Sequence, residues 1–118
     1  MSAMSFMHAN AIRVRAGKVS MSRGFYRGFA LCALWISMAA AWGAKHHVPV
    51  TCNEFGAYRR YSPPADRAVW INDMRTALEK HGIGWTMWDY AGGFNVVIKE
   101  NGKATPDVAI VRALGLSR

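Results

Sequence analysis

The sequence predicts an α/β domain in which a helix joins two parallel strands. Three observations predict this class: an apolar, β-favouring run that ends in a glycine turn (48–56), an apolar stripe with helical spacing (70–81), and a glycine-bounded aromatic run (82–90). A second helix is predicted near the C-terminal end. This order is the βαβα pattern of a parallel sheet with its helices on the outside.

The first strand is expected within VPVTCN (48–53), where Pro49 suits the first residues of a strand. The chain then turns at Gly56 and continues as a loop. Ser62 followed by Pro63 is typical of a helix start, because serine caps free N–H groups and proline fits the first helical turn.

The helix that follows is predicted to be amphipathic. Asp66 lies in its first turn, where a carboxylate interacts favourably with the positive end of the helix. The apolar stripe comprises Trp70, Met74, Ala77, Leu78 and His81. Gly82 is the expected stop.

The second strand is expected within GIGWTMWDY (82–90), as a buried strand. The remainder is predicted as a loop (91–94), a short extended segment (Asn95–Lys99), an Asn101-Gly102 turn, and a last helix that begins at Thr105-Pro106-Asp107 and ends at Gly115.

Strand alternation predicts which side chains share a face, because one face recurs every second residue. The expected sets are Val50, Cys52 and Glu54 on the first strand, and Gly84, Thr86 and Trp88 on the second. The last member of each set lies at the C-terminal end of its strand, where α/β sheets carry their sites. A carboxylate beside an indole suits sugar chemistry, since the ring packs on a pyranose and the carboxylate attacks or stabilises the anomeric carbon.

The composition excludes several classes of protein. The 118 residues are enough for one small domain, and 52% hydrophobic with 19% charged residues fits neither a disordered tail nor a bundle of membrane spans. Cys32 and Cys52 cannot form a disulfide scaffold, and no CxxC pair indicates a zinc site. His46 and His47 have no third ligand near them in the sequence, so no metal is expected.

The positive charge is unevenly distributed. The chain has 15 Lys and Arg against 7 Asp and Glu, yet residues 1–53 contain six basic residues and no acid. We therefore predict a basic, poorly ordered leader at 1–34 and a folded domain at 35–118. The basic residues are scattered and not interleaved with aromatic residues, which argues against nucleic-acid binding.

The apolar segment 28–44 has four competing interpretations. With the basic residues before it and the A-x-A-like stretch Ala39–Ala41, it resembles a secretory signal, although the basic region is long for one. It also fits a transit peptide, a marginal membrane span, or a buried helix of the domain. Membrane contact through 28–44 is not the favoured interpretation.

Two segments resemble a known family. HHVPVTCNEFGAYRRY (46–61) followed by GIGWTMWDYAGGF (82–94) resembles the last quarter of glycoside hydrolase family 5, the cellulase family. The resemblance covers roughly 35–116 and implies strands seven and eight, with their helices, of an incomplete TIM (β/α)8 barrel. It favours a buried helix near 35–45, because ISMAAAWGAKHHVPV resembles the helix that leads into strand seven.

The resemblance also implies roles for single residues. Glu54 falls on the catalytic nucleophile, and Trp88 on the tryptophan that stacks on the sugar. Asp89 and Tyr58 lie near the expected cleft and are further candidates for substrate contact. The family hydrolyses β-linked glucans and mannans with retention of configuration and without a cofactor, so a β-glucan substrate and a secreted or periplasmic location are expected.

One departure from the family bears on activity. The acid/base glutamate of the family belongs to a second Asn-Glu pair, and the sole Asn-Glu here is Asn53-Glu54. Loss of general acid catalysis costs about 10²–10⁴-fold. We therefore expect a truncated or misframed hydrolase with little activity alone. The alternative is a non-catalytic small protein, exported or membrane-associated, that retains a carbohydrate-facing surface.

Overall fold

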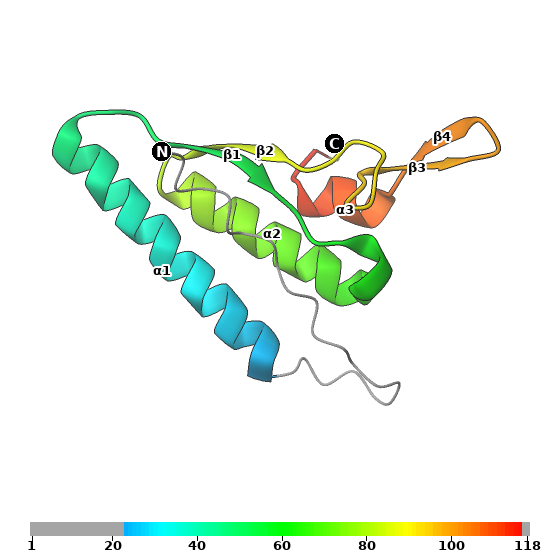
Figure 1. The fold of residues 1–118 in the computed structure, drawn as a ribbon, viewed down its shortest axis with the longest axis horizontal. Coiled ribbons are helices and arrows are strands. Elements are labelled where there is room, and N and C mark those ends of the chain that lie inside the picture. The colour runs from blue at the N-terminus through cyan, green and yellow to red at the C-terminus, as the bar shows by residue number, and fades with distance from the viewer. Residues whose placement is uncertain (1–22, 117–118) are drawn as a thin grey trace.

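The structure, a computed structural model, describes the backbone of residues 23–116 and the side chains of residues 29–116. Its elements are α1 (Arg23–His46), β1 (Thr51–Phe55), the 3-10 turn η1 (Arg59–Tyr61), α2 (Pro64–Lys80), β2 (Gly84–Met87), β3 (Val97–Glu100), β4 (Lys103–Pro106) and α3 (Val108–Ala113). Figure 1 shows α2 and α3 below the strands β1 and β2, with α1 beside α2. The mixed α/β class predicted from the sequence is confirmed.

The described strands form two separate pairs. β1 and β2 are parallel, with Thr51 opposite Gly84 and Cys52 opposite Trp85. β3 and β4 form an antiparallel hairpin that projects from the body of the molecule (Figure 1). The parallel pair with α2 between its strands is the predicted βαβ unit, and α3 completes the βαβα order.

The core fills the space between the helices and one face of the β1–β2 sheet. Phe55 is 1% exposed, and its ring meets the ring of Trp85 edge to face at 5.6 Å and the ring of Trp70 at 6.4 Å. Trp85 thus packs on the helix side of the sheet, as predicted, and its Nε1 donates to Glu79 of α2 at 3.2 Å. Ile36, Ile71, Met74, Leu78 and Ile110 complete the buried centre.

The shared face predicted for β1 is wrong for Cys52 and Val50. Cys52 is buried against the helices and Val50 packs on the same cluster, whereas Glu54 is exposed. The register shifts between Cys52 and Phe55, so that two consecutive residues are exposed between two buried ones. A bulge of this kind turns a side chain to the opposite face of a strand.

α2 begins at Pro64, slightly later than predicted, and the structure gives Ser62 no capping bond to it. Asp66 does lie in its first turn. The buried side of α2 also differs from the predicted stripe: it includes Arg67 and Ile71, and His81 is exposed at the C-cap, before Gly82 with its φ of 65°.

The C-terminal part contains a strand that the sequence did not predict. Thr105 and Pro106 belong to β4 and not to a helix start. The predicted turn is present, since Asn101 and Gly102 have φ angles of 49° and 77°, as a tight two-residue hairpin turn requires. α3 starts after Asp107, whose side chain accepts a hydrogen bond from the backbone N–H of Ile110.

The apolar segment 28–44 lies within the single helix α1, which runs across the predicted boundary between 34 and 35. α1 is buried on one side only, through Ile36 and Gly43. None of the helices described has the length and hydropathy that a membrane crossing requires. The greater part of the predicted leader, residues 1–22, lies outside the described residues.

Candidate functional site

The two predicted principal site residues come from adjacent strand ends. Glu54 is the penultimate residue of β1, and Trp88 directly follows β2. The backbone nitrogen of Trp88 donates a 2.8 Å hydrogen bond to the carbonyl of Phe55, the residue after Glu54. The C-terminal ends of the two strands are therefore joined where these side chains originate.

Both side chains are open to solvent. Trp88 is 48% exposed, and Glu54 is also exposed. The exposed positions of the two strands and their ends are Thr51, Asn53, Glu54, Gly84, Thr86 and Trp88. Thr51 donates from its hydroxyl to the amide oxygen of Asn53 at 2.9 Å, which orients that side chain next to Glu54.

Gly56 allows the loop after β1 to pass close to the end of β2. A Cβ atom at this position would lie 2.2 Å from the carbonyl oxygen of Trp88 and 3.2 Å from the Phe94 ring. No side chain fits in that space. The glycine in the N-E-F-G motif is therefore required for the approach of the two strand ends.

Asp89 holds a turn beside the site. Its carboxylate accepts a 2.9 Å hydrogen bond from the backbone nitrogen of Gly92, and its carbonyl accepts one from Val96 at 3.0 Å. The peptide bond between Trp88 and Asp89 is cis. Contact of Asp89 with a sugar hydroxyl stays a prediction.

Tyr58 connects the loop after β1 to the loop after β2. Its ring meets the Phe94 ring edge to face at 5.1 Å and the Tyr61 ring at 5.5 Å. The backbone nitrogen of Arg59 donates to the carbonyl of Gly93 at 2.9 Å. Tyr58 is half-buried by these contacts, and its role in substrate binding also stays a prediction.

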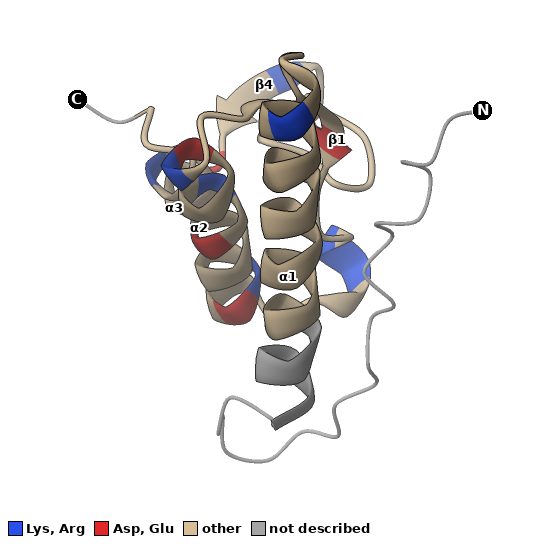
Figure 2. Ribbon diagram, turned by 90° about the vertical axis from the view of Figure 1, so that its left-hand side faces the viewer, with Lys and Arg blue, Asp and Glu red and all other residues tan. Residues whose placement is uncertain are grey.

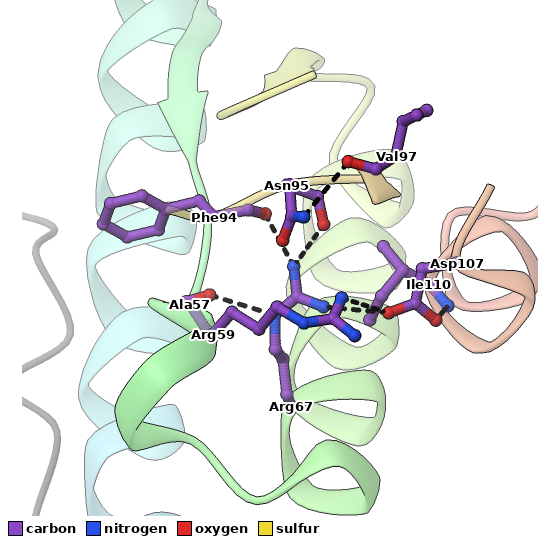
Figure 3. Close-up of polar contacts among 8 residues, drawn as sticks. All are labelled: Ala57, Arg59, Arg67, Phe94, Asn95, Val97, Asp107 and Ile110. Carbon is purple, nitrogen blue, oxygen red and sulfur yellow. Dashed lines mark hydrogen bonds and ion pairs between the residues drawn. The ribbon is translucent and has the colours of Figure 1, made fainter. Parts of the chain in front are cut away.

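Sequence reasoning missed Arg67, a charged residue on the buried side of α2. Its side chain is 2% exposed, and its guanidinium donates to the carbonyl oxygens of Ala57 at 3.1 Å, Phe94 at 2.6 Å and Asn95 at 2.7 Å. Figure 3 shows these acceptors converging on one side chain from the loops that follow β1 and β2. Arg67 therefore fixes both loops relative to α2.

Asp107 provides the negative charge of this cluster. Its carboxylate lies 2.7 Å from the guanidinium of Arg59 and 3.6 Å from that of Arg67 (Figure 3). Burial lowers the pKa of the Arg67 guanidinium, and the charge of Asp107 opposes this shift. Arginine stays protonated at any ordinary pH, so the guanidinium keeps all its donors.

The spacing of residues in the sequence of α2 contained an indication that Arg67 is buried. Arg67, Ile71, Met74 and Leu78 follow one another at the spacing of one helical face, and all are buried. A stripe defined by apolar residues alone omits the arginine. An arginine in phase with a buried stripe predicts a cation that binds backbone carbonyls in the interior.

The exposed residues of the two strands and their ends, which we call the open face (Thr51, Asn53, Glu54, Gly84, Thr86 and Trp88), include one carboxylate and one indole. The chain's other acids lie elsewhere: Asp66, Asp73 and Glu79 on α2, Asp89 in its turn, Glu100 on β3, and Asp107 beside Arg59. Within the described residues no three His, Cys, Asp or Glu side chains form a group that suits a metal ion. The arrangement can supply a nucleophile and a stacking surface, but no second carboxyl group.

Comparison with known proteins gives one match among curated proteins and several among solved structures. No protein-family model matches the chain. Over 68 residues, 58% of this chain, the sequence is 41% identical to Endoglucanase 3 of Fibrobacter succinogenes, and the chain covers 10% of that protein. The chain is thus a homologue of an endoglucanase and spans a tenth of its length.

Two solved structures share the fold of this chain over about a third of their own length. The cellulose synthase subunit Z of Clostridioides difficile matches with a TM-score of 0.68 and 24% identity over 80% of this chain and 31% of its own. Cel5A of Thermotoga maritima, solved in complex with cellobiose, matches with a TM-score of 0.68 and 23% identity over 92% of this chain and 35% of its own. The resemblance to the cellulases of glycoside hydrolase family 5 is confirmed by these matches.

Proposed function

We propose that this chain, a homologue of an endoglucanase, supplies the nucleophile half of a retaining glycosidase site for β-1,4-linked glucan. Glu54 is the nucleophile, and Trp88 stacks on the sugar ring in front of it. The observation that carries the proposal is the 2.8 Å hydrogen bond between Trp88 and Phe55, which joins the strand ends that bear the two exposed side chains.

The chemistry assigns one step to this chain. A carboxylate oxygen of Glu54 attacks the anomeric carbon and forms a glycosyl–enzyme ester, while the glycosidic bond breaks and its electron pair leaves with the aglycone oxygen. A second carboxyl group about 5–5.5 Å away protonates that oxygen and later activates water. Because no other acid of this chain lies on the open face, hydrolysis by the chain alone is expected to be about 10²–10⁴-fold slower than by a complete site.

The strand assignment belongs to the same proposal. β1 and β2 correspond to strands seven and eight of a (β/α)8 barrel, in which functional side chains lie at the C-terminal strand ends. The support for this assignment is that N-E-F-G and W-x-x-W-D-Y occur at the ends of the two paired strands.

The substrate class follows from the relatives. Thermotoga maritima Cel5A was solved with cellobiose and also with mannotriose. We propose a β-glucan or related polysaccharide as the substrate of this chain. Such polymers lie outside the cytoplasm, so the proposed site of action is secreted or periplasmic.

A substrate with an activated leaving group tests the proposal without a second carboxyl group. Dinitrophenolate departs without protonation, so 2,4-dinitrophenyl 2-deoxy-2-fluoro-β-cellobioside needs only the nucleophile, and the fluorine slows release of the ester. Mass spectrometry of digested protein is expected to locate a fluorocellobiosyl group on Glu54. Glu54→Gln removes this label, and Glu100→Gln, a change in the distant hairpin, retains it.

Two results would contradict the proposal. The first is an unlabelled wild-type chain whose circular dichroism spectrum shows that it is folded. The second is release of reducing sugar from carboxymethyl cellulose by the wild-type chain at a rate that Glu54→Gln leaves unchanged.

A further inference from the structure

α1 carries an apolar surface that the rest of the described structure does not cover. Leu31, Leu34, Trp35, Met38 and Trp42, which we call the α1 stripe, are each 53–63% exposed. Their spacing places them along one side of the helix. A contiguous apolar surface of this kind on a folded protein marks an interaction site.

The two tryptophans of the α1 stripe lie on a flank of the helix. With 3.6 residues per turn, Trp35 and Trp42 are roughly 100–120° around the helix axis from Ile36, in the same direction. Ile36 is the side chain through which α1 enters the core. The tryptophans therefore face sideways, where a neighbouring helix in the same layer packs.

β1 has a free edge in the part of the chain that the structure describes. It pairs with β2 alone, so the backbone groups along its other side lack a strand partner there. Parallel sheets normally continue and are covered on both faces. A free edge of this kind is a template for the addition of another strand.

The handedness of strand–helix–strand connections places the free edge of β1 and the α1 stripe next to the same neighbouring unit. α1 leads directly into β1, and the connection from a strand through a helix to the next parallel strand is right-handed. β2 occupies one side of β1, so a strand placed before α1 in such a unit lies at the free edge. A helix belonging to that strand then packs on the flank of α1.

We propose that the α1 stripe and the free edge of β1 together bind a separate polypeptide that carries further strand–helix units of this α/β fold. A strand of the partner adds in parallel to β1, and its helix covers Trp35 and Trp42. The solved structures support this occupant, since the fold of this chain makes up 31–35% of theirs. The inference rests on the proposed function in one respect: the partner brings the second carboxyl group to Glu54.

A lipid surface explains fewer of these observations. Figure 2 shows no charged residue along the coloured part of α1 before Lys45, and residues 1–53 carry six basic residues and no acid, so an anionic bilayer fits the helix. A bilayer leaves the free edge of β1 and the open face around Glu54 without a partner. A protein partner accounts for all three features.

Co-expression tests the interaction without depending on catalysis. The affinity-tagged chain is produced together with Endoglucanase 3 from which the 68 aligned residues have been deleted, and co-purification is measured by light scattering after gel filtration. The expected product is a one-to-one complex. Trp35→Glu is expected to reduce the co-purified partner at least tenfold, while Val108→Glu, which changes an exposed apolar residue of α3, leaves it unchanged.

Further outcomes separate this inference from the proposed function. Glu54→Gln is expected to leave complex formation unchanged and to abolish hydrolysis by the complex. A complex that is inactive with wild-type Glu54 contradicts the proposed function alone. Absence of a complex with the wild-type chain overturns the inference. A homodimer of the chain that Trp35→Glu dissociates also overturns the inference. The inference is overturned as well if the chain alone binds phosphatidylglycerol vesicles, Trp35→Glu abolishes that binding, and the chain does not bind the partner.

Discussion

The buried guanidinium of Arg67 lies 3.6 Å from the carboxylate of Asp107, the residue that caps α3. The same guanidinium donates to carbonyl oxygens in the loops that follow β1 and β2 (Figure 3). A single side chain of α2 therefore ties together the two strand ends and the start of α3. The geometry around Glu54 depends on a residue that does not belong to the site.

Arg67→Met is expected to lower the free energy of unfolding by about 3–5 kcal/mol, because it removes the guanidinium that donates to the carbonyl oxygens of Ala57, Phe94 and Asn95 and that lies beside the carboxylate of Asp107. Urea unfolding followed by tryptophan fluorescence measures the change. Arg60→Met is the matched control: Arg60 is exposed and its guanidinium lies over the Tyr61 ring at 5.6 Å, so a change within about 0.5 kcal/mol is expected. Equal effects of the two substitutions would show that the buried cation is not structurally important.

Gly56→Ala is expected to cost about 2–3 kcal/mol of stability, since the new methyl group meets the backbone carbonyl of Trp88, which cannot rotate away as a side chain does. Gly84 offers a matched control in the neighbouring strand. A Cβ there has only Thr51 Cγ2 near it, at 3.8 Å, so Gly84→Ala is expected to stabilise the strand by about 0.5 kcal/mol. The same urea titration compares both variants, and a harmless Gly56→Ala would mean that the strand ends are not in this close contact.

Local patterns were sufficient to predict the elements that position the site. The period of the apolar residues predicted α2, and the glycine-bounded runs predicted the two strands that pair in parallel. The positions of Glu54 at the end of β1 and Trp88 after β2 follow from these elements. Trp85 was correctly predicted to face the helices, because β2 is regular at that position.

The sequence did not predict the bulge in β1 because a register shift is set by the partner strand and the packing around it. Without the bulge, alternation places Cys52 and Glu54 on one face, whereas Cys52 packs against the helices. The role of Arg67 was missed for a similar reason, since its acceptors are carbonyl groups up to 28 residues away. β4 was missed because Pro106 also resembles a helix start, and its pairing with Val97 is a tertiary contact.

The stability of the chain is expected to fall as the pH rises above 9. Burial raises the pKa of the Cys52 thiol above its ordinary value of 9.0, and the charge of Glu54 adds to the shift, while a backbone hydrogen bond opposes it. Between the two pKa values the unfolded chain has released the proton and the folded chain has kept it, so unfolding is favoured. Below pH 9 both states hold the proton and the thiol makes no contribution to the pH dependence.

The midpoint of urea unfolding, measured from pH 7 to pH 10.5, checks this expectation. Cys52→Ala should show a smaller loss of stability above pH 9 than the wild type, whatever its stability at pH 7. Thr86→Ala changes an exposed residue of β2 and should keep the wild-type pH dependence. If the urea midpoint falls with pH equally in the wild type and in Cys52→Ala, the thiol ionises in the folded chain as readily as in the unfolded one.

Trp88→Ala is expected to slow the labelling of Glu54 by the fluorinated cellobioside about fivefold to tenfold, because loss of the indole face removes about 1 kcal/mol or slightly more of stacking energy from the bound sugar. The stability should change little, since Trp88 is 48% exposed and the backbone hydrogen bond to Phe55 remains. Tyr90→Ala is the matched control: Tyr90 is 65% exposed but lies under Lys99, at 5.6 Å from its Nζ. The rate of labelling, measured by intact-protein mass spectrometry, is expected to stay at the wild-type value in Tyr90→Ala. If both variants slow labelling to the same extent, aromatic residues near the C-terminal end of β2 contribute to sugar binding without distinction. The specific stacking position assigned to Trp88 would then be wrong.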